Sequence, residues 1–339
     1  MAVDTRGAPV TASQPRVASS ELIAFVLMVA FFLVAPLFIY PVFLMKVLCF
    51  ALFACAFNLL LGYVGLLSFG HALFFGWSSY VSAHAAKVWG LPPELAILSG
   101  VAVAALLGLV AGSLAIRRQG IYFAMITLAL AQMMFFFALQ APFTGGEDGI
   151  QAVPRGVLFG IFDLSKIMTM YFTVLVIFLF CFVLIYRIIY SPFGEVLKAI
   201  RENEQRAISL GYKTDRYKLV AFVLSATLTG VAGATKAIVF QLASLTDVDW
   251  TMSGEVVLMT LVGGLGTVFG PALGAAVIIT MQNYLASAGE ISFSLFGFAV
   301  AFQPGQWVPV IQGAIFVLCV LLFRRGIVGE IANWLRIRL

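Results

Sequence analysis

Residues whose types and spacing could support chemistry are concentrated in one segment of this sequence. The segment SPFGEVLKAIRENEQRAISLGYKTDRYK, residues 191–218, interleaves acidic and basic side chains, whereas the stretches on either side of it are almost wholly apolar. Within those apolar stretches the polar residues stand singly. No paired carboxylates, metal-ligand cluster or Ser/His/Asp arrangement is indicated there, and the sequence argues against an enzyme.

Several isolated polar residues could instead line a pathway through the protein. His71, in SFGHALFFG, could act as a ligand or a proton relay. A lone histidine in such a place is more often a packed and hydrogen-bonded residue. The uncharged candidates, which could offer hydrogen bonds toward the interior of a helix bundle, are Ser68, Tyr80, Thr127 and Gln132, with Gln282 and Asn283 further along.

A second notable stretch, GGLGTVFGP at 263–271, is rich in glycine, as phosphate-binding loops are. A P-loop requires GxxxxGK[ST], and no Lys or Ser/Thr is placed for it here. The stretch is therefore predicted to be a turn, because glycine and proline interrupt helices. The turn residues are Gly263, Gly264, Gly266, Gly270 and Pro271. Any ATP would have to be bound by a partner, and we expect no cofactor or metal on this chain.

The composition identifies the surroundings in which these residues must work. Of 339 residues, 62% are hydrophobic and 10% are charged, against about 25% charged in a soluble domain. So few charges cannot cover an aqueous surface, so the chain is predicted to be an all-α polytopic integral membrane protein. The net charge of +5 comes from short segments between apolar runs, which does not favour nucleic-acid binding. The four cysteines lie inside apolar runs and read as small buried hydrophobic residues.

About 20 apolar residues span a bilayer, and the chain offers about ten such segments. They are residues 22–40, 42–61, 66–86, 95–116, 121–140, 167–186, 219–240, 252–265, 270–287 and 307–323. Residues 1–21 are predicted to be a disordered cytoplasmic tail, residues 22–323 the transmembrane domain and residues 324–339 a basic cytoplasmic tail. Whether 252–287 is a hairpin of two spans or one interrupted span stays open, although two spans suit the orientation better.

The distribution of Lys and Arg sets that orientation. Residues 187–218 hold seven of them, whereas 241–255 has three acids and no base. Basic loops face the cytoplasm, so ten crossings would place both termini inside.

Small residues also recur every four positions, at Gly100, Ala104, Gly108 and Gly112, at Ala226, Gly230 and Ala234, and at Gly266, Gly270 and Gly274. Such stripes are typical of close helix packing in membranes.

The charged segment is predicted to contain a helix of its own. Ser191 can cap it, Pro192 suits its first position, and Gly211 stands where a helix commonly stops. Within it, Glu202 is four residues from both Lys198 and Arg206 and could pair with either. The segment is either a solvated connector that fixes topology or a docking element for a cytoplasmic partner.

From these residues onward the sequence also resembles a known family. Residues 191–234 are similar to permease subunits of bacterial branched-chain amino-acid ABC importers, specifically the M-type member of the permease pair. The agreement extends to GLLSFGHALFFG (65–76), GIYFAMITLALAQM (120–133), TGGEDGI (144–150), VLMTLVGGLGTVFGPALGA (257–275) and RRGIVG (324–329). The resemblance covers about residues 45–329, nearly the whole chain.

The resemblance implies an ABC importer permease fold in the bacterial inner membrane. It also implies a second homologous permease, two cytoplasmic P-loop ATPase subunits that bind ATP and Mg, and a periplasmic substrate-binding protein. The loop at 187–218 would supply the helix that couples the ATPases to the membrane domain. The coupling residues would be Glu195, Lys198, Arg201, Glu202, Glu204, Arg206, Ala207 and Gly211.

The sequence departs from the wider importer pattern at a few positions. Importers often have the pattern Glu-Ala-Ala, followed by three residues and then Gly, in this loop. Here the corresponding residues are Gln205, Arg206, Ala207 and Gly211, so only the last two match, which puts the ATPase contacts in doubt. Lys236 stands where the family has an apolar residue; a surface salt bridge with nearby acids, or a contact with a binding protein, would explain it. Lys46 is expected to snorkel to the outer interface.

Two further hypotheses concern cargo and energy source. The cargo could be urea, short amides or other amino acids rather than branched-chain amino acids. An ion-coupled secondary carrier is a different class, but such carriers usually keep carboxylates at mid-membrane. Here all Asp and Glu fall in loops, tails or the ends of segments.

Overall fold

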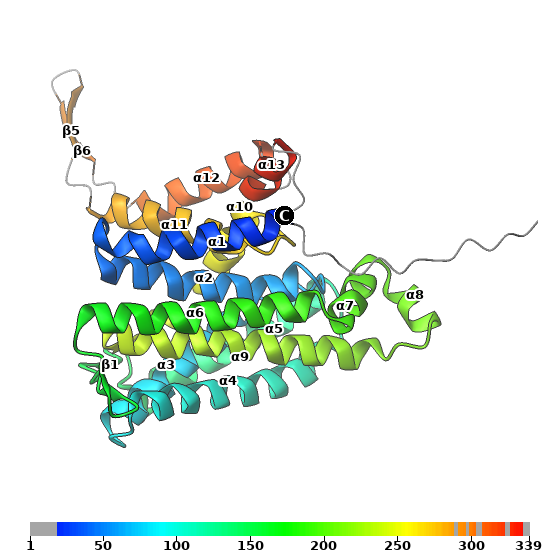
Figure 1. Ribbon diagram of the computed structural model, residues 1–339, viewed down its shortest axis with the longest axis horizontal. Coiled ribbons are helices and arrows are strands. Elements are labelled where there is room, and N and C mark those ends of the chain that lie inside the picture. The colour runs from blue at the N-terminus through cyan, green and yellow to red at the C-terminus, as the bar shows by residue number, and fades with distance from the viewer. Residues whose placement is uncertain (1–18, 288–290, 296–297, 303–306, 323–325, 335–339) are drawn as a thin grey trace, which may run out of the picture.

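The computed structural model describes residues 19–287, 291–295, 298–302, 307–322 and 326–334 (Figure 1). Every one of the ten predicted segments contains a helix. These helices are α1 (Ser19–Val34), α2 (Pro41–Leu61), α3 (His71–Lys87), α4 (Pro93–Ala115), α5 (Ile121–Gln140), α6 (Ile167–Ile189), α9 (Thr214–Phe240), α10 (Trp250–Gly263), α11 (Gly270–Ser287) and α12 (Val308–Leu322). The chain is thus an all-α polytopic membrane protein. Among the described residues five helices, α2, α4, α5, α6 and α9, are long and apolar enough to cross a bilayer, so the number ten stays a prediction.

Several helix boundaries differ from the predicted ones, and three of them concern residues of the candidate site or its neighbours. Helix α3 begins at His71 instead of residue 66, because residues 62–70 form a glycine-containing turn in which Gly65 has a φ of +80°. Helix α9 begins at Thr214, five residues before its predicted start. Helix α1 already begins at Ser19, so Glu21 is helical, whereas the sequence predicts it to lie in the tail. The other tail residues, 1–18, and the basic residues 335–339 lie outside the described part.

Helices α2 and α9 form the centre of the bundle. In their most apolar stretches 89% and 78% of the residues are buried, against 33%, 22% and 39% in α4, α5 and α6. Helix α3 packs against α9 and α4, while α2 also contacts α6 and α11. Figure 1 shows α2, α6, α9 and α4 running side by side along the long axis. The outer helices present apolar side chains to their surroundings, as lipid requires.

Two of the small-residue stripes face each other across one helix pair. A Cβ at Gly108 would meet Ala226, one at Gly230 would meet Ala104, and one at Gly100 would meet Ala234 and the backbone of Ser78. Residues nearer the end of α4 face residues nearer the start of α9, so the two helices are antiparallel. Their close approach is the packing role that stripes of small residues have in membranes.

The stretch 252–287 is a hairpin of two helices. A Cβ at Gly263 would meet Gly270 and Gly274, and one at Gly274 would meet Met259, so α10 and α11 run antiparallel. The turn between them covers residues 264–269, where Gly264 and Gly266 have φ of +129° and +77°. Gly270 and Pro271 begin α11 and so lie just beyond the turn. Gly266 likewise belongs to the turn, so the third stripe is shorter than predicted.

The two ends of the bundle differ in their short elements. One end carries α7 (Pro192–Glu202), α8 (Glu204–Ser209) and α13 (Gly326–Trp334). The other carries the antiparallel pairs β1 (Ile150–Gln151) with β4 (Leu242–Ala243), β2 (Val157–Leu158) with β3 (Phe162–Asp163), and β5 (Ile291–Leu295) with β6 (Phe298–Phe302). The 3₁₀ turns are η1 (Ala35–Leu37), η2 (Pro142–Thr144) and η3 (Leu245–Asp247).

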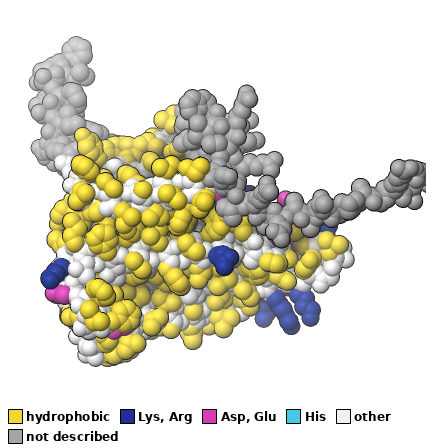
Figure 2. All heavy atoms as spheres, in the orientation of Figure 1, with side chains coloured by type: hydrophobic (Ala, Val, Ile, Leu, Met, Phe, Trp, Pro, Cys, Tyr) yellow, Lys and Arg dark blue, Asp and Glu magenta, His cyan; other side chains and the backbone are white. Residues whose placement is uncertain are grey.

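Basic and acidic loops separate between these ends. At one end, the β1–β4 pair joins the acidic stretches 142–155 and 241–255. At the other end, the Gln119 side chain donates to Glu204 of α8, which places the neighbouring Arg117 and Arg118 close to the charged segment. Figure 2 shows an apolar surface between the ends, with Lys and Arg gathered mainly at the α7–α8 end. This segregation is the pattern that the charge distribution of the loops predicted.

Candidate functional site

The charged segment folds into a short amphipathic helix that lies on the end of the bundle. The Ser191 side chain accepts a hydrogen bond from the Gly194 backbone N–H (3.3 Å), and Pro192 occupies the first position, as predicted. Leu197 and Ile200 are buried beneath α7, and the Phe193 ring stacks on Tyr217 of α9. The apolar face therefore fixes α7 to the membrane domain while its polar face stays outside.

The predicted single helix is in fact two, because Asn203 interrupts it. Asn203 has extended backbone angles (φ −158°, ψ 97°), and its side chain accepts a hydrogen bond from the Arg206 N–H (3.0 Å), capping α8. Asparagine favours such caps over a helix interior, which is the reason for the break. The prediction of one continuous helix to Gly211 is therefore wrong, although Gly211 does follow the end of α8 with a φ of +90°.

The break also changes the charge pairing. Lys198 pairs with Glu195 (2.8 Å) and not with Glu202. In the described part of the chain Glu202 and Arg206, on opposite sides of Asn203, are exposed and form no ion pair. Their charges are free to contact another molecule.

Glu204 turns inward and ties α8 to two other elements. One carboxylate oxygen accepts from Gln119 in the α4–α5 loop (2.8 Å), and the other pairs with Lys218 of α9. The Lys218 side chain is only 2% exposed, so the pair is shielded from water. Ala207 is buried next to it. Glu204 and Ala207 thus hold the unit in place.

Arg201 connects α7 to two glycine-rich turns. Its guanidinium donates to the Gly62 carbonyl, at the end of α2. A Cβ at Gly65 would lie 3.1 Å from the Arg201 side chain, and one at Gly266 would lie 3.2 Å from its Nη1. The absence of side chains at these glycines is what lets the guanidinium lie between the turns.

Asn58 joins the same two turns from the α2 side. Its Nδ2 donates to the Thr267 carbonyl (2.9 Å), and its Oδ1 accepts from the Gly266 N–H (3.0 Å). The side chain is 2% exposed and uses both ends of its amide. Through Asn58 and Arg201, the turn after α2 and the α10–α11 turn form one unit with α7. We call this set (Asn58, Gly62, Gly65, Arg201, Gly266) the turn junction.

Two of the five candidate pathway residues hydrogen-bond to the backbone of the turn after α2. Ser68 accepts from the Gly70 N–H (3.2 Å) and Thr127 accepts from the Phe69 N–H (3.2 Å). Both hydroxyls are buried and stabilise the bend before α3. They serve the local backbone in this structure, and neither points into a cavity that the structure shows.

His71 is fully buried at the start of α3. Ser225 donates its hydroxyl proton to the Ala56 carbonyl (2.6 Å), so it must accept from His71 Nε2–H (2.9 Å). The ring meets Phe57, Phe74 and Phe222 edge to face. Nδ1 has no partner among the described residues. This geometry belongs to a packed, hydrogen-bonded histidine in an aromatic cage.

The remaining two candidates lie elsewhere. Tyr80 is buried further along α3, and its hydroxyl has no partner among the described residues. Gln132 is half-buried on α5. The five residues therefore do not converge on one cavity.

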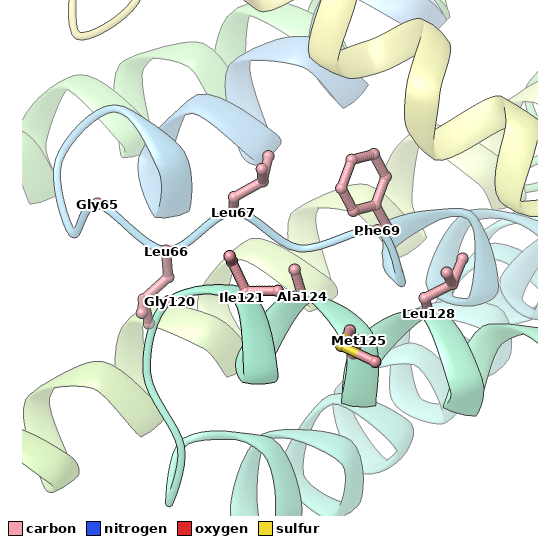
Figure 3. Close-up of a pocket in the computed structure, with 9 residues that line it drawn as sticks. All are labelled: Gly65, Leu66, Leu67, Phe69, Gly120, Ile121, Ala124, Met125 and Leu128. Carbon is pink, nitrogen blue, oxygen red and sulfur yellow. The ribbon is translucent and has the colours of Figure 1, made fainter.

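The cavity nearest the turn junction is apolar. It has a volume of about 450 Å³ and is bordered by the turn after α2 and the first half of α5 (Figure 3). Its lining consists of Gly65, Leu66, Leu67, Phe69, Gly120, Ile121, Ala124, Met125 and Leu128. With no charged side chain at its wall, it suits an acyl chain or a neighbouring helix better than a polar solute.

Lys236 forms a salt bridge, as expected, but a buried one. Its Nζ lies 2.5 Å from Asp247 Oδ2, and the two residues are 8% and 2% exposed. Asp247 also accepts from the Ser244 N–H (3.3 Å). The prediction of a surface pair is wrong because η3 folds Asp247 back over the end of α9.

Sequence reasoning missed several residues. Glu21 accepts hydrogen bonds from Tyr186 and Tyr190 (2.8 Å each), which ties α1 to the end of α6 just before α7. Glu255 lies six residues into α10 and so inside a helix, not at its end. A carboxylate at the edge of an apolar run was the available signal in both cases.

Comparison with known proteins gives the family. Residues 40–320 match the family model described as branched-chain amino acid transport system / permease component. The chain is 26% identical over 263 residues to the high-affinity branched-chain amino acid transport system permease protein LivM of Salmonella typhimurium, and equally to LivM of Escherichia coli, covering 71% of this chain and 62% of each relative. The ribose import permease protein RbsC of Bacillus subtilis is 28% identical over 58% of either chain.

The chain thus spans about three fifths of the length of the LivM relatives that it matches. No solved structure gives a significant match. Because the family model covers residues 40–320, well over half of the 339, this chain belongs to the branched-chain amino acid transport system permease family, whose members are transporter components and not enzymes.

Proposed function

We propose that the chain is the M-type permease subunit of an ATP-driven importer of branched-chain amino acids in the bacterial inner membrane. The observation that carries the proposal is the two-sided α7–α8 unit. One side holds the turn junction and α9 through Arg201 and Glu204, and the other presents Glu202 and Arg206, which are exposed and form no ion pair with any residue that the structure describes. A loop that only connects two membrane spans would need neither these inward contacts nor the exposed charges.

The proposed importer contains a second homologous permease, two cytoplasmic P-loop ATPase subunits and a periplasmic binding protein. ATP and Mg belong to the ATPases, and both termini of this chain are cytoplasmic. When the ATPases close, they move α7 and α8. Arg201 passes that movement to the ends of α2, α3, α10 and α11, and Glu204 passes it to α9 and to the α4–α5 loop.

Branched-chain amino acids are the favoured cargo because two LivM proteins are among the relatives. Urea, short amides and other amino acids are the alternatives within the same transporter class, and selection among them would rest largely with the binding protein. An ion-coupled secondary carrier is the alternative class. The two-sided unit argues against it, since a carrier has no ATPase to dock.

The test is to purify the tagged chain from native membranes in mild detergent and to identify every protein that accompanies it. We expect two P-loop ATPases, a second permease and a binding protein. Reconstituted liposomes should then take up leucine with ATP and without an ion gradient. A chain that purifies alone, and whose transport needs an ion gradient but no ATP, would establish the carrier instead.

A control variant sharpens the same experiment. Glu202→Gln with Arg206→Gln should reduce the amount of co-purified ATPase, because it removes both unpaired charges without touching the inward contacts. The matched control is Lys87→Gln, an exposed lysine at the other end of the bundle. Equal ATPase recovery from the unmodified protein, the double variant and the control would contradict the docking role.

A further inference from the structure

The apolar cavity of Figure 3, which we call the α5 cavity, has the length and position of a site for an acyl chain. It follows the first two turns of α5 from Gly120 to Leu128, over about 12 Å at 1.5 Å per residue. Its opposite wall is the turn after α2, with Leu67 and Phe69. Because Gly65 of this turn lies beside Arg201, the cavity starts at the α7–α8 end of the bundle and extends toward its middle.

The α5 cavity is open to the surroundings of the protein. Ile121 and Met125 in its wall are 78% and 60% exposed, and Ala124 and Leu128 are partly exposed. Helix α5 packs mainly against α3 and α4, and the exposed side of the cavity is not covered by any element that the structure describes. The molecule that fills it must therefore come from outside this chain.

Two positive charges stand where the α5 cavity starts. Arg117 and Arg118 lie in the α4–α5 loop just before it, both are exposed, and neither side chain forms a hydrogen bond or ion pair with a described residue. Gln119 next to them is held by Glu204, whose carboxylate is already paired within the chain. Tyr122, in the first turn of α5, is largely exposed, as tyrosines at a membrane–water interface commonly are.

We propose that the α5 cavity and the two arginines bind one anionic phospholipid. An acyl chain lies in the cavity along α5, and the phosphate of the headgroup accepts hydrogen bonds from Arg117 and Arg118, whose planar guanidinium groups suit phosphate. The lipid belongs to the leaflet at the α7–α8 end, which the predicted orientation makes the cytoplasmic one. The proposal goes beyond the proposed function and depends neither on the cargo nor on the ATPases.

A helix of a second permease is a poorer occupant for reasons of size and charge. A helix is about 10 Å across, so 12 Å of it would occupy roughly 900 Å³, and only its side chains could enter a cavity of about 450 Å³. Cytoplasmic loops of membrane proteins are rich in Lys and Arg, so a homologous permease would bring more positive charge toward Arg117 and Arg118. An anionic lipid brings the opposite charge, and basic groups at the cytoplasmic ends of helices are typical sites for such headgroups.

The test places a fluorescent bimane beside the α5 cavity and measures its quenching by brominated lipids. Ala129→Cys is the labelling position, because Ala129 is exposed one turn beyond Met125 and does not line the cavity. The purified full chain is reconstituted in phosphatidylcholine vesicles with increasing fractions of brominated phosphatidylglycerol or brominated phosphatidylcholine. We expect half-maximal quenching at a clearly lower fraction of phosphatidylglycerol than of phosphatidylcholine. With Arg117→Gln and Arg118→Gln combined, that fraction of phosphatidylglycerol should rise about tenfold.

Matched variants separate a bound lipid from ordinary contact with the bilayer. Phe180→Cys, exposed on α6 nine residues before its end, reports on a similar depth away from the cavity and should be quenched equally by both lipids. Arg187→Gln removes an exposed arginine at the same end of the bundle and should leave the quenching at Ala129→Cys unchanged. Ala124→Phe fills the cavity without changing charge and should weaken the preference for phosphatidylglycerol. The unmodified protein, treated with the same bimane, corrects for labelling of the native cysteines.

Four results would overturn the proposal. Equal quenching by the two lipids at Ala129→Cys would show ordinary contact with the bilayer. A preference that survives the loss of both arginines would refute the headgroup contact, and one that survives Ala124→Phe would refute the position of the acyl chain. Weak quenching at Ala129→Cys by either lipid, with normal quenching at Phe180→Cys, would show a protein partner over the cavity. None of these results involves ATP-driven uptake or co-purification, which test the proposed function separately.

Discussion

At the scale of single residues, Arg201 separates transmission from docking. Although Arg201 is exposed, its guanidinium contacts the Gly62 carbonyl and lies beside Gly266, so its charge is held by the membrane domain. Arg201→Met should therefore leave ATPase capture unchanged and lower ATP-driven uptake about tenfold, as expected for loss of a charged hydrogen bond. Co-purification of the ATPases and the rate of uptake, measured on the same preparation, check the two parts of this prediction.

Arg201→Lys is the informative companion variant. Lysine keeps the charge but has no planar guanidinium to lie between the two turns, so it should recover only part of the uptake rate. A loss of ATPase capture in Arg201→Met, with uptake per captured ATPase unchanged, would show that Arg201 docks and does not transmit.

The buried pair Lys236–Asp247 gives a prediction about stability. Lys236→Met leaves the Asp247 carboxylate buried without its cation, which costs about 3–5 kcal/mol when one partner of such a pair is removed. The midpoint of thermal unfolding in detergent should fall clearly. Lys236→Met combined with Asp247→Asn should recover much of it, because Asn can still accept from the Ser244 N–H and carries no charge.

The exposed Lys87, which donates to the Gln151 carbonyl (2.7 Å), is the control at the same end of the bundle. Lys87→Met should change stability by about 0.5 kcal/mol or less. If the double variant were no more stable than Lys236→Met alone, charge burial would not be the reason for the loss.

At the scale of secondary-structure elements, the end of α8 depends on one backbone conformation. Gly211 has a φ of +90°, and nothing lies within 4 Å of where its Cβ would be. Gly211→Leu is therefore strained by its backbone alone, at about 1–2 kcal/mol. It should weaken ATPase capture by displacing α8. Gly211→Asn should be tolerated, since asparagine adopts this conformation more readily. Equal capture by the two variants would mean that the end of α8 does not matter for docking.

The α10–α11 hairpin depends instead on space. A Cβ at Gly274 would collide with Met259 and Gly263, whereas one at Gly254, in the same hairpin, would meet nothing within 4 Å. Gly274→Ala should therefore lower the unfolding midpoint and reduce the yield of folded protein, and Gly254→Ala should not. Size-exclusion chromatography and thermal unfolding of both variants measure the difference. Equal behaviour would contradict the close packing of α10 and α11.

The sequence predicts the features that depend on neighbouring residues better than those that depend on residues far apart in the chain. Apolar runs and caps are local signals, so the helices, Ser191 and the turn at 264–269 were predictable. The α4–α9 register was visible only as two separate stripes. The break at Asn203 had a local signal that the surrounding helix formers outweighed. Arg201 between two turns and Asn58 across them depend on residues up to 209 positions apart in sequence, which no local pattern encodes.

At the scale of the whole molecule, burial is distributed unevenly. Helices α2 and α9 are enclosed by this chain alone, whereas 22% of the apolar stretch of α5 is buried. The exposed face of α5 carries Ile121, Met125, Met133 and Phe136, all more than half exposed. An outer face of this kind suits lipid or a second permease.

Orientation is the remaining property of the whole molecule, and three exposed positions test it. Gln205 lies in α8, Thr246 in η3 and Ser287 at the end of α11. Cysteines placed there one at a time in intact cells should react with a membrane-impermeant maleimide at Thr246→Cys and Ser287→Cys but not at Gln205→Cys. Permeabilised cells should label all three.

Ser287→Cys is the decisive position, because it distinguishes ten crossings from nine. If α10 and α11 each cross the membrane, the chain returns to the outside at residue 287 and the basic C-terminal end lies in the cytoplasm. If the hairpin enters and leaves on the outer face, its turn could not reach Arg201, which the structure places beside Gly266. Protection of Ser287→Cys in intact cells, with Thr246→Cys labelled, would therefore contradict the two-span hairpin.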